Sequence, residues 1–130
     1  MEDLEAAIAA VVEGDVNRLS TVLTADHLEL LDAAAKLPQL SVSRSALTRV
    51  LKEWRNGHCS AEDVQRWASF VRRGYVSGNS GGIRPIDIEY DAMDEELIVE
   101  IVGRFDEIGD LIDGRIDDNE QEEMLRALQG

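Results

Sequence analysis

The segment that begins at Gly109 has residue types and spacing suited to the second half of a calcium-binding loop. Asp113, Asp117 and Glu120 match positions five, nine and twelve of an EF-hand loop. Positions one and three should also supply side-chain oxygen, but Gly109 and Leu111 stand there. A loop that lacks these two ligands binds calcium poorly. We therefore predict no metal site, and we expect Asp117 and Glu120 to cap a helix instead.

Residues of the types that form a nucleophile–base pair occur together at His58 and Cys59. Neighbours in sequence rarely face each other with attack geometry, and two residues are too few to bind zinc. Cys59 is the only cysteine, so the chain forms no internal disulfide, and we expect this side chain to be small and buried. We therefore expect no cofactor and no enzymatic activity. An enzyme or a metal-dependent hydrolase is the least favoured class.

Carboxylates crowd the stretch that follows Pro85. We predict a partner-binding site there, in which charge steers the partner and a few desolvated side chains anchor it. Its residues are Asp87, Glu89, Tyr90, Asp91, Asp94, Glu95 and Glu96. A second acidic group is better explained by stabilisation of a helix N-terminus, and comprises Asp117, Asp118, Glu120, Glu122 and Glu123.

The net charge of −14 is unevenly distributed along the chain. Residues 1–40 carry 8 acids and 2 bases, residues 41–84 carry 3 acids and 8 bases, and residues 85–130 carry 16 acids and 3 bases. A solubilising surface is the simpler interpretation of this charge, and an acidic face for a basic protein is the sharper one. Binding of nucleic acid is disfavoured, because phosphate contacts need a cationic surface.

The basic middle segment raises the alternative of a DNA-binding helix-turn-helix. Its cations are Arg44, Arg49, Lys52, Arg55, Arg66, Arg72 and Arg73. The second helix of this unit would begin with Glu62 and Asp63, which phosphates repel. We expect these arginines to pair with acids of neighbouring helices and to cover apolar surface with their aliphatic stems.

The spacing of apolar residues predicts an all-α fold, a compact bundle of about six or seven helices. Two tight helical hairpins are expected, with turns at Gly57 and Gly114. The third helix should point Leu28, Leu31, Ala34 and Ala35 inward. The sixth should carry a stripe of about four turns through Leu97, Ile98, Ile101, Val102, Phe105, Ile108, Leu111 and Ile112. The last should follow Asp117.

The region between the fifth and sixth helices should be irregular. Residues 77–84 are expected to form a flexible Gly/Ser loop. Ile86, Ile88 and Tyr90 alternate with acids, but the sequence offers no evident pairing partner, so we expect a loop or an edge segment.

Residues 1–130 are expected to form a single domain. The acidic N-terminus does not resemble a signal peptide, and no run is long enough to span a membrane, so a cytoplasmic location is expected.

The hairpin around Gly57 contains the segments LKEWRNG at 51–57, SAEDV at 60–64 and WA at 67–68. These segments, about a sixth of the chain, resemble small helical bacterial immunity proteins of the colicin type. The resemblance implies an inhibitor that covers the active site of a basic bacterial toxin with acidic residues of its C-terminal third. The alternative from another class is a regulatory or structural helical module that acts as a homodimer.

Overall fold

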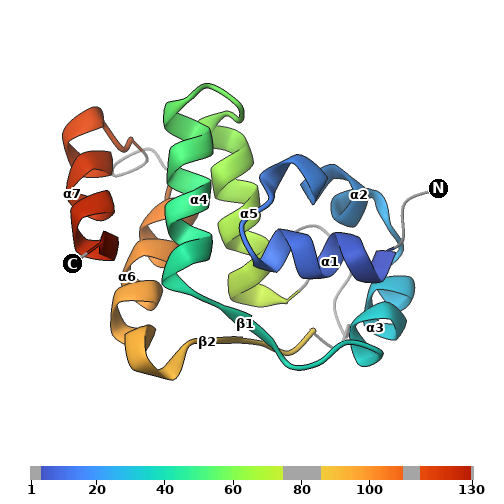
Figure 1. Ribbon diagram of the computed structural model, residues 1–130. Coiled ribbons are helices and arrows are strands. Elements are labelled where there is room, and N and C mark those ends of the chain that lie inside the picture. The colour runs from blue at the N-terminus through green and yellow to red at the C-terminus, as the bar shows by residue number, and fades with distance from the viewer. Residues whose placement is uncertain (1–3, 75–85, 110–114, 130) are drawn as a thin grey trace.

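The computed structural model describes residues 4–74, 86–109 and 115–129, and within these it contains seven α-helices and one small sheet (Figure 1). The helices are α1 (Leu4–Val12), α2 (Leu19–Thr24), α3 (His27–Ala35), α4 (Arg44–Arg55), α5 (Ala61–Arg73), α6 (Glu95–Asp106) and α7 (Asp118–Gln129). Two 3₁₀ turns, η1 (Val16–Arg18) and η2 (Ala92–Asp94), precede α2 and α6. The predicted all-α fold is confirmed.

The antiparallel pair of α4 and α5 forms the centre of the molecule, as Figure 1 shows. Ser43 begins α4, where its hydroxyl accepts a hydrogen bond from the Ala46 amide. Ser60 and Asp63 begin α5 with a complete capping box, in which each side chain accepts a hydrogen bond from the other residue's amide. The predicted turn at Gly57 is confirmed, because this residue takes a left-handed φ of 78° between the two helices.

The helices α1 to α3 pack on one side of this pair, and α6 and α7 lie on the other (Figure 1). Buried Trp67 joins α5 to α1 by donating its indole N–H to the carbonyl of Val11 at 2.7 Å. Close contact with α4 also explains Gly14, where a Cβ would lie 2.5 Å from the carbonyl oxygen of Ala46. The core is one cluster, and its largest fully buried side chains include Trp67, Phe70 and Phe105.

The expected inner face of the third helix is wrong in part. Leu28 is 73% exposed and Ala35 is also exposed, whereas His27, Leu30 and Ala33 point inward. Both faces of this short helix carry apolar residues, so spacing alone does not choose between them. Packing against α1 selects the face that contains Leu30.

The expectation that Ile88 has no strand partner is also wrong. β1 (Leu40–Val42) and β2 (Ile88–Tyr90) form a two-stranded parallel sheet, with Ser41 opposite Glu89. The sequence does not predict β1, because this segment is only three residues long and lies just after Pro38. The expected alternation is confirmed, because Ile86 is buried while Asp87 and Glu89 point outward.

The helix α6 is shorter than its apolar stripe suggested. It ends at Asp106, and Gly109 follows with a left-handed φ of 92°. The predicted turn at Gly114, the stripe residues Leu111 and Ile112, and the loop at 77–84 lie outside the described residues. Within the described ranges, every helix is too short or too polar to cross a membrane.

Candidate functional site

The predicted acidic residues lie just before and within β2, at η2, and in the first turn of α6. Five of them are exposed and make no ion pair within the described part of the chain. We call this group the acidic surface: Asp87, Glu89, Asp91, Glu95 and Glu96. Asp91 accepts a hydrogen bond from the Ser41 hydroxyl at 3.2 Å, which fixes its side chain beside β1. The acidic surface therefore presents negative charge that no ion pair among the described residues neutralises.

Two other residues of the predicted site serve the fold. Asp94 is partly buried and forms an ion pair with Arg44, with 3.5 Å between nitrogen and oxygen. Tyr90 is half-buried and packs against the core. Burial is the main cause that raises the pKa of Tyr90, with Arg72 lowering it and Asp106 raising it. Neither side chain is a freely projecting anchor.

Large apolar side chains are nevertheless exposed beside the acidic surface. Met93 in η2 is 94% exposed, and Val99 in α6 is 50% exposed. Glu95 and Glu96 lie between them in sequence, and Glu100 follows. Isolated exposed apolar residues are common, but here two of them lie among carboxylates that make no ion pair in the described chain. Met93 and Val99 therefore project from this surface, whereas Tyr90 does not.

The basic middle segment is largely neutralised by acids within the fold. Arg72 and Arg73 both pair with Asp106 at 3.0 Å, and the Asp106 side chain is only 5% exposed. Arg49 pairs with Asp15 at 3.7 Å. Arg66 pairs locally with Glu62. The expected pairing with neighbouring helices is confirmed for Arg72 and Arg73, which join α5 to α6, but Arg66 pairs within α5.

Two arginines of α4 attach the last helix. Arg44 donates to the carbonyl of Ala127 near the end of α7 at 3.1 Å. Arg55 pairs with Glu122 at 3.0 Å and also donates to the carbonyl of Asp118. Because Arg44 begins α4 and Arg55 ends it, the two contacts align α7 antiparallel to α4.

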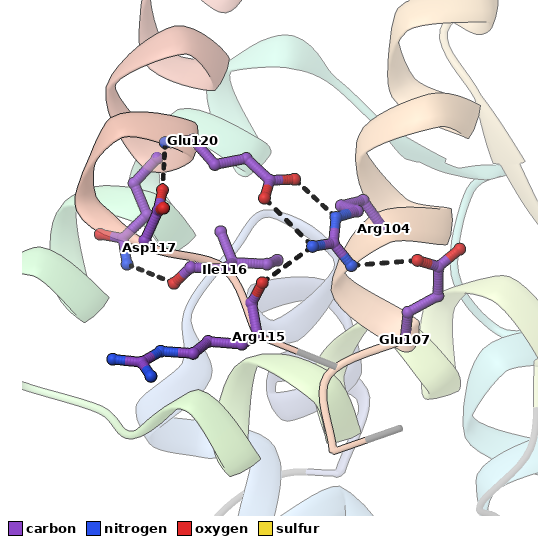
Figure 2. A network of polar contacts seen from close by, with 7 residues as sticks. Arg104, Glu107, Arg115, Ile116, Asp117 and Glu120 are labelled. Atoms are coloured by element: carbon purple, nitrogen blue, oxygen red, sulfur yellow. Dashed lines mark hydrogen bonds and ion pairs between the residues drawn. The ribbon is translucent and has the colours of Figure 1, made fainter. Parts of the chain in front are cut away.

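A third arginine, Arg104 of α6, connects this helix to residues at the start of α7 (Figure 2). Its guanidinium donates to both carboxylate oxygens of Glu120, to Glu107 at 3.0 Å and to the carbonyl of Arg115 at 2.9 Å. The hydrogen bond with Glu120 is the largest cause that raises the pKa of Arg104. Asp117 caps α7 by accepting from the Glu120 amide, as predicted. The Glu120 carboxylate does not complete the capping box, because Arg104 binds it.

A groove runs between the antiparallel helices α6 and α7, with a volume of about 430 Å³. We call it the α6–α7 groove. Its apolar lining consists of Leu97, Ile101, Met124 and Ala127, and its charged lining of Glu100, Arg104, Glu107, Glu120 and Glu123. Gly103 of α6 also lines the groove. Of these residues, Ile101 and Met124 are buried, whereas Glu100, Glu107 and Glu123 are exposed, so the groove combines buried apolar side chains with exposed carboxylates.

The geometry around Cys59 does not resemble that of an activated nucleophile. Burial first, and then the charges of Asp63 and Glu53, raise the pKa of the Cys59 thiol to about 11. His58 directs Nδ1 to Glu53, with 2.8 Å between nitrogen and oxygen, and so is engaged away from the thiol. Among the described residues, no group of three or more His, Cys, Asp and Glu side chains is placed to hold a metal ion.

Sequence reasoning did not identify the groove. Leu97 and Ile101 belong to the apolar stripe expected for the sixth helix, and the pairing of α6 with α7 decides which residues of that stripe border an opening. One signal was present: Gly103 interrupts a strongly apolar helix, where glycine lowers helix stability. No family model, curated protein or solved structure matches this chain.

Proposed function

We propose that this chain is a protein-interaction module that binds a basic protein partner through the acidic surface. The observation that supports this proposal is the unequal use of charge. The arginines of the middle segment pair with acids inside the fold, while Asp87, Glu89, Glu95 and Glu96 make no ion pair in the described ranges. Unpaired carboxylates accelerate encounter with a basic partner and disfavour acidic ones.

Met93 and Val99 provide the apolar contacts that such a surface needs for affinity. Steering charge alone gives fast but weak association, and tight complexes depend on a few buried apolar or aromatic anchors. Met93 has a flexible and polarizable side chain, which adapts to partners of different shape.

In its more specific form, the proposal is a cytoplasmic immunity-type inhibitor of a basic bacterial toxin. Support for this form comes from the resemblance of the hairpin at 51–68 to immunity proteins, and from the negative charge beyond Pro85. The alternative, a homodimeric regulatory or structural module, is less well supported. A symmetric contact through Met93 and Val99 would place the carboxylates of one copy against those of the other, which is unfavourable.

The test is a pull-down of the tagged chain from its native cells at low and high salt. The acidic-surface variant is Glu95→Lys/Glu96→Lys, and the matched control is Glu13→Lys/Glu29→Lys, whose two exposed acids have no ion pair in the described ranges. Both variants change the net charge by the same amount. Thermal unfolding establishes that each is folded.

We expect the wild-type chain and the control to recover one basic protein at low salt and less of that protein at high salt. The acidic-surface variant should not recover it. Recovery of no basic protein would count against the proposal. So would equal recovery by both variants, because it would show that net charge alone causes the association. A dimer in analytical ultracentrifugation together with an empty pull-down would favour the homodimer.

A further inference from the structure

We infer that the α6–α7 groove is the docking site for an amphipathic, lysine- and arginine-rich helix of the basic partner. This inference rests on the proposed function and names the structural element that the partner contributes. The groove lies beside the acidic surface, because Leu97 and Glu100 at its edge follow Glu95 and Glu96 on α6. A partner that contacts the acidic surface is therefore within reach of it.

The chemistry of the lining selects such a helix. Leu97, Ile101, Met124 and Ala127 offer apolar lining along two antiparallel helices, with Ile101 and Met124 buried. A helix with apolar residues at steps of three and four matches a lining of this kind, as in other complexes that seat a helix in a groove. Glu100 and Glu123 stand on the two sides without an ion pair in the described chain, so cationic flanks on the incoming helix would complement them.

Gly103 is an independent sign that something approaches α6 closely. It lies inside the helix, where alanine would be more stable. A Cβ at this position would meet no atom within 4 Å, so no internal contact requires glycine. Gly14 is different, because the carbonyl of Ala46 leaves no room for a Cβ there. Glycine at 103 keeps the groove open, and this suits the close approach of another backbone.

Two contacts hold α7 in place, one at each end of the groove. Arg104 joins α6 to Glu120 at the start of α7, and Arg44 binds the carbonyl of Ala127 near its end. Because α7 is attached at both ends, the groove exists before a partner binds. Preorganisation of this kind lowers the entropic cost of association.

The test uses two synthetic peptides of the same composition, rich in lysine and leucine and about 16 residues long. In one, the leucines recur at helical spacing and form a single apolar face. In the other, they are distributed around the helix. Fluorescence anisotropy measures both affinities for the wild-type chain, for Gly103→Leu and for Gly103→Ala. Methyl NMR spectra report on Ile101 and Met124.

We expect the amphipathic peptide to bind wild type at least ten times more tightly than its isomer and to shift the methyl signals of Ile101 and Met124. Gly103→Leu should remove this preference, because its side chain would occupy the groove. Gly103→Ala should raise the melting temperature. It should also weaken the binding of the amphipathic peptide, by a smaller factor than Gly103→Leu does. That variant separates loss of binding from loss of folding.

Equal affinity for the two peptides, or undiminished preference in folded Gly103→Leu, would overturn the groove assignment. If Glu95→Lys/Glu96→Lys still weakened the binding of both peptides, the proposed function would stand without the groove assignment. If neither peptide bound the wild-type chain at low salt, the groove assignment would fail and the acidic surface would lose its support as well.

Discussion

The basic hairpin of α4 and α5 and the acidic surface use charge in opposite ways. In the hairpin, arginines such as Arg72 and Arg73 pair with the nearly buried carboxylate of Asp106 on α6. On the acidic surface, Glu95 and Glu96 extend into solvent without an ion pair in the described chain. The sign of a segment's charge therefore says less about function than whether the fold neutralises it.

The largest effect concerns the thiol in the turn of the basic hairpin. With a pKa of about 11, the folded Cys59 thiol carries far less thiolate at pH 8 than a thiol of ordinary pKa 9.0. Alkylation by iodoacetamide should be about 100-fold slower in the folded than in the urea-unfolded chain. Its rate should rise about tenfold per pH unit and continue to rise above pH 10. Mass spectrometry measures this rate, and equal rates in the two states would contradict the assigned environment.

The second effect tests the neutralisation of the hairpin. Asp106→Ala removes the acceptor shared by Gln65, Arg72 and Arg73. We expect the free energy of unfolding to fall by about 2 kcal/mol, less than for a fully buried pair because both arginines are half-exposed. The control Glu89→Ala removes an exposed carboxylate that has no ion pair in the described chain, and it should stay within about 0.5 kcal/mol of wild type. Urea denaturation measures both, and similar losses would remove the contrast between the two regions.

The third effect compares two ion pairs. A double-mutant cycle with Arg104→Met and Glu120→Gln should give a coupling energy of about 1 kcal/mol, because this pair joins two helices and is partly buried. The same cycle with Arg66→Met and Glu62→Gln should give about 0.3 kcal/mol, as for exposed pairs one turn apart. A larger coupling in the local pair would show that Arg104 does not hold α7.

The smallest effect is a response to salt. Exposed carboxylates without ion pairs repel one another, and added salt screens this repulsion. We expect the melting temperature to rise by about 2 °C between 20 and 300 mM sodium chloride. The variant Glu95→Gln/Glu96→Gln should show a smaller rise. A melting temperature that falls with salt would indicate that attraction, and not repulsion, dominates the surface.

Much of the fold was predictable because its signals are local. The caps at Ser43 and Ser60, the turn at Gly57 and the core face of α4 follow from residue type and spacing within one or two turns. The partners of long side chains were not predictable. Nothing local to Glu120 indicates that Arg104 would take its carboxylate from the capping box.

The candidate site was likewise predictable only where its signals are local. The acidic residues after Pro85 could be read from composition, and five of them are exposed. That Asp94 would pair with Arg44 and Tyr90 would pack against the core depends on contacts between distant segments. The strand at Leu40–Val42 was missed because three residues show no periodicity until Ile88–Tyr90 lies beside them. The α6–α7 groove exists only through the pairing of its two helices.

The most direct test of the central claim is hydrogen–deuterium exchange of the chain with and without the basic protein that it captures. We predict slower exchange on binding in 87–107 and in α7, with the hairpin of α4 and α5 unchanged. Protection of the hairpin, with no change in 87–107, would contradict the account, because it would locate the partner on the region whose charges the fold already neutralises.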